Sequence, residues 1–443
     1  MRLPTVQMKT IATPFRRSVF AHVSTVAAAI AAVACGSPSD DEGTSEAAQT
    51  AAVNAIATDY DCAWYQKENG YDDAVKTLAS RGLKPGQGIT IGLIDTGYLP
   101  NPEFMTPAVP GAGVILPEAE RFTIGLPTNF VEKDHAYDAL DRINPSRSIA
   151  DAWGHGTSNL SLLLGVGLRL PGEVGQVRGV VPYARVLPIR VSTGVVLLTP
   201  EEVSAAANGV RSALGRGAKV ISMSMGAGFD TAPPPPPPPS TSFDDSRQTS
   251  PLWTSDPPLQ HAADLAEAAG AIFVAAAGQR QQIRLARPAS FANVIGVGGA
   301  ARGQKAWDST RGSAVVISAP AEGICVSEVA GPPDARGAYT FRHRKYDGTS
   351  YSTVLVSAVA AMWLAYHGYD NLVKRYGKKN LGRVFRYVLV TGGHTTPRGW
   401  DTQGHGVGIV NADMTLKAPL PSCSAVVDEC AASLKQSLAK LGH

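Results

Sequence analysis

Short apolar runs rich in β-branched residues alternate along the chain with segments whose apolar residues recur at helical spacing. Runs that end in a polar residue or a glycine are typical of strands buried on both faces of a parallel sheet. The pattern therefore predicts an α/β fold with a doubly wound, mostly parallel sheet flanked by helices on both faces. A functional site should lie at the carboxyl ends of its strands. The expected strands span residues 88–95, 184–191, 219–225, 271–278 and 293–299, and the expected helices span 155–167, 200–214 and 259–269.

The longest apolar stretch, YSTVLVSAVAAMWLAYHG, follows the turn DGTS, which ends at Ser350. Its residues are apolar nearly all round a helix, so the helix should lie in the core. At the N-terminus of such a helix, Ser350 has unpaired backbone N–H groups, a dipole that favours negative charge and a rigid support. These properties suit an acyl-transfer nucleophile, although a Ser in this place can also serve only as a helix cap.

Two more polar residues lie at junctions between a strand and a helix. Asp95 ends an apolar strand in the sequence IDTG, where an Asp can also simply form a turn. His155 lies in GHGT at the start of an expected helix, where a lone His would more often be structural. With Ser350 they give the order Asp, His, Ser at three similar junctions, which predicts a nucleophilic triad.

The blocks IGLIDTGY, DAWGHGTS and DGTSYS resemble the three active-site blocks of the subtilisin-like serine proteases, the subtilases. Further segments such as VISMSMG and IFVAAAG are also similar, and the resemblance covers residues 60–418 apart from a proline-rich insertion. It implies a subtilisin-like fold and a serine endopeptidase that hydrolyses peptide bonds through an acyl-enzyme. In that reaction Ser350 would attack the peptide carbonyl, His155 would take and return the proton, and Asp95 would orient and support the imidazolium.

The resemblance also implies where the substrate binds. The oxyanion hole would be formed by the backbone N–H of Ser350 and by the side chain of Gln279, which stands where the family usually has Asn. The carboxamide is kept but is one methylene longer. The pocket for the residue before the scissile bond would be walled by Ser224, Met225, Gly226, Ala276, Ala277 and Gly278. This small and apolar lining favours an apolar side chain there.

Two other functions remain open on the sequence alone. Gln279, together with Val354 in place of the family's usual Pro in the nucleophile helix, would also fit a catalytically weak or dead surface binding protein of subtilase fold. The intact triad argues against this alternative. A transpeptidase or peptide macrocyclase could use the same acyl-enzyme. No cofactor is evident: family resemblance makes calcium an option, but residues 166–179 are poor in oxygen ligands and identify no metal site.

Residues 1–34 resemble a bacterial export signal of the lipoprotein type, with a twin Arg before an Ala-rich apolar stretch that is short for a membrane span. The sequence AVAC, which ends at Cys35, resembles the lipoprotein motif in which the chain is cleaved before the Cys and the Cys thiol is lipidated. Ordinary secretory cleavage nearby is the alternative. Residues 35–59 are small, polar and acidic, which favours a flexible tether. We therefore expect an exported protein that is anchored to the membrane at the cell envelope through Cys35, or secreted.

Charge narrows the range of partners. The formal net charge of +3 becomes −1 without the four basic residues of the first 34. Such a chain has no basic patch that would indicate a nucleic-acid partner. We expect polypeptide substrates and a monomeric protein.

Four cysteines remain besides the lipidation candidate, and they allow three pairings. The short separation of Cys423 and Cys430 favours a local loop, which leaves Cys62 to join Cys325. Disulfides of this kind agree with an oxidising compartment.

Two segments fall outside the strand–helix pattern. A run of seven prolines at 233–239 cannot enter a strand or a helix and marks a surface insertion at about residues 229–258. The tail, residues 419–443, has the spacing of a short amphipathic helix. We expect this helix to dock onto the domain, and binding of a partner is the alternative.

Overall fold

A computed structural model of the chain describes residues 62–105, 114–115, 127–142, 152–168, 170, 175–229, 257–279 and 286–426. Several predictions concern other residues and stay predictions. They are the export signal, the tether, the lipidation of Cys35, nearly all of the proline-rich insertion, and Cys430 with the rest of the tail beyond Val426.

The main sheet is built from strands that match the apolar runs, together with shorter strands at its margins. Its strands are β1 (Thr90–Asp95), β2 (Val114–Ile115), β3 (Arg185–Arg190), β5 (Val220–Met223), β7 (Ile272–Ala276), β9 (Ile295–Ala301), β10 (Lys305–Ala306), β11 (Val315–Pro320), β14 (His394–Thr395) and β15 (Ile409–Val410). The order in the described part is β14-β15-β11-β9-β7-β5-β1-β3-β2, with β10 beside β9. The pairs from β15 to β2 are parallel, and only β14 and β10 pair antiparallel with their neighbours. The predicted α/β fold is confirmed.

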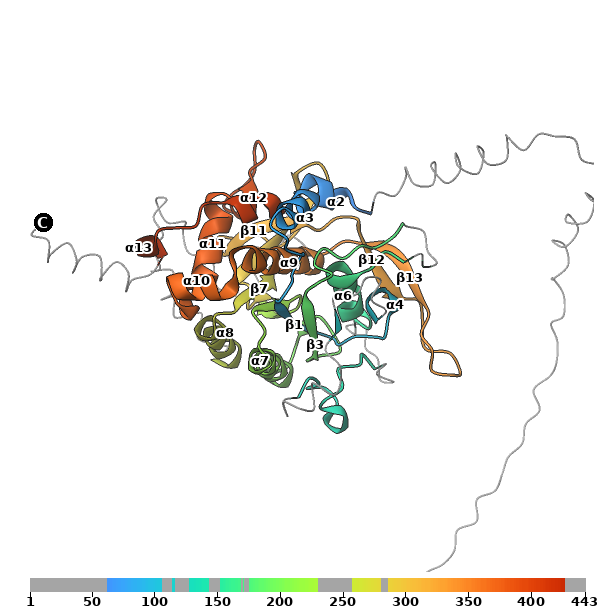
Figure 1. The fold of residues 1–443 in the computed structure, drawn as a ribbon. Helices are drawn as coiled ribbons and strands as arrows, with labels where there is room; N and C mark the ends of the chain where they lie inside the picture. Colours follow the sequence, from blue (N-terminus) through green and yellow to red (C-terminus); the bar gives the residue numbers. More distant parts are fainter. Residues whose placement is uncertain are drawn as a thin grey trace, which may run out of the picture. The chain divides into compact units, whose positions relative to one another are not determined.

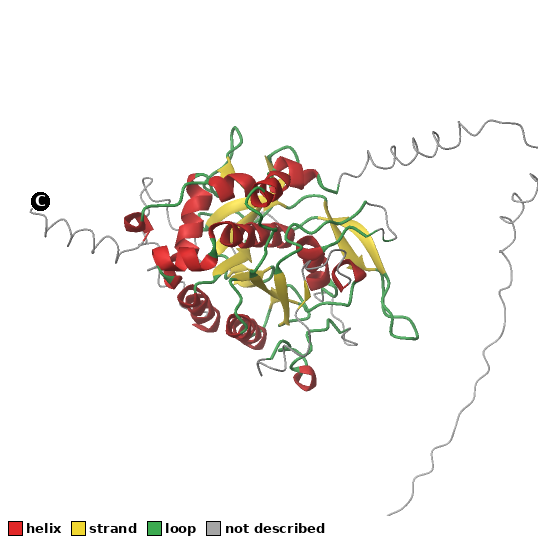
Figure 2. Ribbon diagram, viewed as in Figure 1, coloured by secondary structure: helices red, strands yellow, loops and turns green. Residues whose placement is uncertain are grey.

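Helices cover both faces of this sheet (Figures 1 and 2). On one face, α6 (His155–Leu164), α9 (Thr349–His367) and α11 (Leu381–Thr391) share a core with strand residues such as Ile91 and Val274. On the other, α7 (Pro200–Gly215) and α8 (Pro257–Ala269) pack on alternate strand residues such as Ile94 and Phe273. Strand side chains point alternately to the two faces, so an all-apolar strand contributes to both cores.

Helix α9 is the buried helix that the apolar stretch predicts. Its side chains from Thr349 to Leu364 are all buried, and Val354 is fully enclosed. The helix is long and apolar enough to cross a membrane, but 89% of its apolar window is buried inside the fold. We therefore assign it to the core of the domain, where it packs on β5, β7, β9 and β11.

A two-stranded antiparallel hairpin, β12 (Ile324–Val329) and β13 (Phe341–Tyr346), leads directly into α9 and forms a separate sheet in Figure 1. The disulfide between Cys62 and Cys325 ties its first strand to the N-terminal segment of the described chain. Cys423 is also disulfide-bonded. Its expected partner, Cys430, lies outside the described residues.

The remaining elements are short and lie around the sheet. The helices are α2 (Trp64–Glu68), α3 (Tyr71–Ala79), α4 (Pro102–Met105), η1 (Lys133–His135), α10 (Tyr369–Tyr376), η4 (Lys378–Asn380), α12 (Ala412–Lys417) and α13 (Cys423–Val426). A small sheet joins β4 (Val196–Leu197), β6 (Gly226–Phe229) and β8 (Ala286–Arg287) in that order.

Candidate active site

The predicted triad residues are placed by elements that meet at the carboxyl edge of the main sheet. Asp95 is the last residue of β1, His155 is the first residue of α6, and Ser350 lies in the first turn of α9. Helices α6 and α9 pack against each other, and Ser350 contacts Ser224 just beyond β5, the strand next to β1. The fold thus brings residues that are far apart in sequence to one edge of the sheet.

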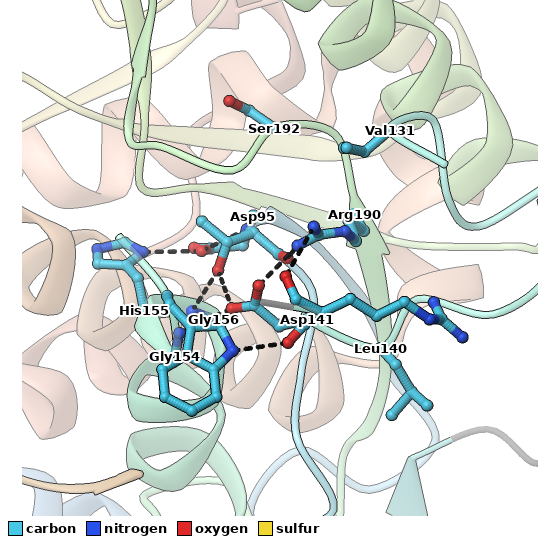
Figure 3. Close-up of polar contacts among 12 residues, drawn as sticks. Asp95, Val131, Leu140, Asp141, Gly154, His155, Gly156, Arg190 and Ser192 are labelled. Atoms are coloured by element: carbon cyan, nitrogen blue, oxygen red, sulfur yellow. Dashed lines mark hydrogen bonds and ion pairs between the residues drawn. The ribbon is translucent and has the colours of Figure 1, made fainter. Parts of the chain in front are cut away.

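Asp95 and His155 are in direct contact. Asp95 Oδ1 lies 2.7 Å from His155 Nδ1 and also accepts the backbone N–H of Thr96 at 2.7 Å (Figure 3). The other oxygen, Oδ2, accepts the side-chain N–H of Asn159 at 2.9 Å. Because an ionised carboxylate can only accept, His155 Nδ1 must carry the proton, which leaves Nε2 as the acceptor for a nucleophile.

Asn159 was not predicted from the sequence. It lies one helical turn after His155 and so presents its amide on the same face of α6. Its position four residues after the histidine was the available signal. With its amide and the Thr96 N–H in place, the Asp95 carboxylate, which is 1% exposed, is held by hydrogen bonds on both oxygens.

Electrostatics at this pair favour a protonated His155 more than usual. Burial alone would lower its pKa, but the charge of Asp95, the hydrogen bond to it and the charge of Asp141 together raise the pKa above the ordinary value of 6.5. The side chain keeps 15% of its surface exposed. A protonated His155 is therefore stabilised by two buried carboxylates.

Ser350 is 9% exposed and contacts Ser224, just beyond the end of β5. Its hydroxyl donates to the carbonyl oxygen of Ser224 at 3.3 Å, and the Ser224 hydroxyl donates back to the carbonyl oxygen of Ser350 at 2.9 Å. Within the described residues the Ser350 hydroxyl is not hydrogen-bonded to His155. Long or unformed contacts of this kind are common in proteases without substrate, and transfer of the Ser350 proton to His155 would require the hydroxyl to turn away from Ser224.

The Gln279 amide lies beside the turn that carries the nucleophile. A Cβ atom built on Gly348 would be 2.7 Å from Gln279 Nε2 and 3.8 Å from the backbone N of Ser350. Gln279 Nε2 and the backbone N of Ser350 therefore lie on the same side of Gly348. Gly278, with φ of +105°, provides the left-handed turn that leads from β7 to Gln279. This arrangement can stabilise negative charge on an oxygen.

The six expected pocket residues lie at or directly after the ends of two neighbouring parallel strands, β5 and β7, and so lie at the same edge of the sheet. Ser224, Met225, Ala276 and Ala277 are all buried. A Cβ on Gly226 would meet the Cβ of Ala286 in β8 at 2.5 Å, so this glycine permits the packing of β6 on β8.

A metal site would need a cluster of ligating side chains. In the part of the chain that the structure describes, no group of three or more His, Cys, Asp and Glu residues could hold a metal ion. In the segment expected to be poor in calcium ligands, the backbone N–H groups of Val166, Gly167 and Leu168 instead donate to the buried carboxylate of Glu103 at 3.0–3.3 Å.

Comparison with known proteins gives a family and a fold. A family model described as the subtilase family, Peptidase_S8, matches residues 86–391. The crystal structure of MycP1 with its N-terminal propeptide removed is similar, with 19% identity and a TM-score of 0.52 over 81% of this chain and 98% of that chain. Proteases from Pseudoalteromonas arctica PAMC 21717 are similar with 21% identity and a TM-score of 0.54 over 81% and 97%. No curated protein matches.

Proposed function

The chain belongs to the subtilase family, and we propose that it is a serine endopeptidase that hydrolyses peptide bonds through an acyl-enzyme on Ser350. The observation that carries this proposal is the 2.7 Å contact between Asp95 Oδ1 and His155 Nδ1 at the sheet edge where α9 begins. It fixes the tautomer in which His155 Nε2 can accept a proton. The family consists of serine proteases, and we propose that this member is catalytically active.

The residues divide the reaction between them. The Ser350 hydroxyl turns from Ser224 towards His155 Nε2, gives up its proton and attacks the substrate carbonyl carbon. The resulting oxyanion is held by the amide of Gln279 and the backbone N–H of Ser350. His155 then protonates the leaving amine as the peptide C–N bond breaks. A water molecule, deprotonated by His155, hydrolyses the acyl-enzyme and restores Ser350.

The preference for the substrate side chain before the scissile bond is inferred from the residues at the carboxyl ends of β5 and β7. The residues at this edge that the family resemblance places in the pocket, Ala276, Ala277 and Met225, are small or apolar, which favours an apolar side chain before the scissile bond. Polypeptides are thus the proposed substrates. Export, and anchoring to a membrane through Cys35, remain part of the proposal because of the N-terminal sequence alone.

Turnover of a peptide library by purified wild-type protein and by Ser350→Ala tests the proposal. We expect new amino and carboxyl termini with wild type only, enriched after apolar residues. A parallel incubation with an added amine distinguishes hydrolysis from transfer, because a transpeptidase would yield amide products in place of free acids. Absence of cleavage by folded wild type over the whole library would contradict the proposal.

A further inference from the structure

We propose that Asp141 is a positioning residue of the catalytic site, whose carboxylate joins the turn after Asp95 to the turn before His155 and whose charge supports the imidazolium. The inference rests on the proposed peptidase function. Asp141 lies between β2 and α6, in a segment without strand or helix periodicity. It is 1% exposed.

The Asp141 side chain contacts both turns with one oxygen. Oδ2 accepts the Thr96 hydroxyl at 2.9 Å and the backbone N–H of Gly154 at 2.7 Å. Thr96 directly follows Asp95 and donates its own N–H to the Asp95 carboxylate, while Gly154 directly precedes His155. One carboxylate oxygen therefore holds the residues on either side of the Asp95–His155 contact (Figure 3).

A second bridge strengthens the first. The Thr96 hydroxyl accepts the backbone N–H of Gly156 at 3.2 Å, so Thr96 connects Asp141 to the far side of His155 as well. The two backbones are close: a Cβ on Gly156 would lie 2.0 Å from the carbonyl oxygen of Gly97. The turn after Asp95 and the turn around His155 are therefore in close backbone contact, with no space for side chains between them. Small changes in Asp141 would move His155 relative to Asp95.

Arg190 keeps Asp141 in place from the opposite side. This guanidinium is fully buried, and its Nη1 lies 2.6 Å from Asp141 Oδ1 and also donates to the carbonyl oxygen of Thr96. Its Nε and Nη2 donate to both oxygens of Glu132 at 2.7–3.2 Å. Such a forked set of hydrogen bonds fixes the guanidinium in one geometry.

The charges around Asp141 come from four parts of the chain. Arg190 contacts it from β3 and is itself paired with Glu132, just before η1; Asp95 lies at the end of β1, and His155 lies at the start of α6. Burial raises the pKa of Asp141 to about 6, against the lowering effects of Arg190, Gly154 and Thr96. The group is therefore ionised at neutral pH. Its charge then acts with that of Asp95 to raise the pKa of His155.

A neutral amide cannot replace this carboxylate. Arg190 Nη1, the Thr96 hydroxyl and the Gly154 N–H all donate to Asp141, and the Thr96 hydroxyl already accepts from Gly156. The NH₂ group of an asparagine would face one of these donors whichever way it turned. Asp141→Asn therefore removes the charge and sets an NH₂ group against a donor, either at the Thr96–Gly154 bridge or at Arg190, with almost no change in volume.

The test compares Asp141→Asn with Asp134→Asn, a matched exchange at an exposed position in η1, in the same connection between β2 and α6. Active-site titration first gives the fraction of competent enzyme, so that kcat is expressed per active site. We expect Asp141→Asn to lower this kcat by about 10- to 100-fold, as misplacement of catalytic groups does. The acid limb of kcat/KM should also shift to lower pH, because a negative charge near His155 is lost. Asp134→Asn should leave both unchanged.

A second readout does not depend on activity. The NMR signals of the His155 ring can be identified because they are missing in His155→Gln. Their pH titration should give a lower His155 pKa in Asp141→Asn than in wild type. If the wild-type protein showed no peptidase activity but the His155 pKa were still lower in Asp141→Asn, the proposed function would be overturned and the coupling of Asp141 to His155 would be supported. An unchanged His155 pKa, together with wild-type kcat per site, would overturn the inference.

A milder pair of variants keeps the inference testable where Asp141→Asn does not fold. Thr96→Val removes the bridging hydroxyl with little change of shape, and Thr96→Ser retains it. We expect kcat per active site to fall about 10-fold in Thr96→Val and to stay within about twofold of wild type in Thr96→Ser. Equal kcat values in the two variants would contradict a bridge through this hydroxyl.

Discussion

Replacing Gly348 with Ala tests the placement of Gln279, the proposed oxyanion donor, without altering the triad. The added Cβ would lie 2.7 Å from Gln279 Nε2, which is closer than van der Waals contact, so the amide has to move away. The backbone of Gly348 is extended, with φ of 161° and ψ of 145°, and accepts alanine without strain. The group that moves is the end of a flexible, exposed side chain, so the free energy of unfolding should hardly change.

The magnitude follows from the role of the displaced amide. Loss of one side-chain donor from an oxyanion hole lowers kcat by about 100- to 1,000-fold, or roughly 3–4 kcal/mol. We expect a loss of about 100-fold in Gly348→Ala, and a similar loss in Gln279→Ala. KM should change by less than about twofold, since this hydrogen bond strengthens only in the transition state.

Steady-state kinetics on a fluorogenic peptide would measure these losses, with thermal unfolding as the check on the fold. Gly331→Ala is the matched control, because a Cβ there would meet nothing within 4 Å. In the Gln279→Ala background the Gly348→Ala exchange should cost much less, since the colliding amide is gone. Wild-type kcat in Gly348→Ala would refute the reasoning. An equal loss in both backgrounds would show that the methyl group acts on a different part of the site.

Three further predictions follow from the site and its support. Asp95→Asn should lower kcat by about 10⁴-fold, because the amide no longer holds His155 in the productive tautomer; a loss below tenfold, measured per active site, would contradict this. The kcat/KM of wild type should rise with pH through a midpoint above 6.5, because His155 acts as the neutral base and its pKa is raised; a midpoint at or below 6.5 would be inconsistent with the two buried carboxylates. Replacing Cys62 and Cys325 with Ala should lower the free energy of unfolding by about 2–4 kcal/mol, because their bond spans a sequence separation of 263 residues; denaturant unfolding with unchanged stability would refute it.

The sequence was informative where local pattern determines structure. Apolar runs that end in a polar residue or a glycine predicted β1, β5 and β7, because a parallel strand with helices on both sides is buried on both faces. The same reasoning predicted α9 as a core helix. The positions of Asp95 and Ser350 next to these elements then followed from sequence alone.

Other parts of the site depend on contacts between distant segments. Asp141 lies 45 residues from Thr96, in a segment without periodicity, and nothing local indicates that it reaches the turn after Asp95. Arg190 belongs to an apolar strand, where its burial became understandable only with Asp141 and Glu132 around it. The hydrogen bonds between Ser350 and Ser224 likewise depend on how α9 packs on β5.

Reaction of the purified protein with diisopropyl fluorophosphate tests the central claim most directly. The reagent modifies a serine whose proton is removed by a neighbouring base, so peptide mapping by mass spectrometry reports nucleophile and base together. We predict a single adduct on Ser350 in wild type, none in Ser350→Ala, and a rate lower by several orders of magnitude in His155→Ala. A folded wild-type protein in which Ser350 stays unmodified, or reacts equally fast without His155, would contradict the assignment of a catalytic triad.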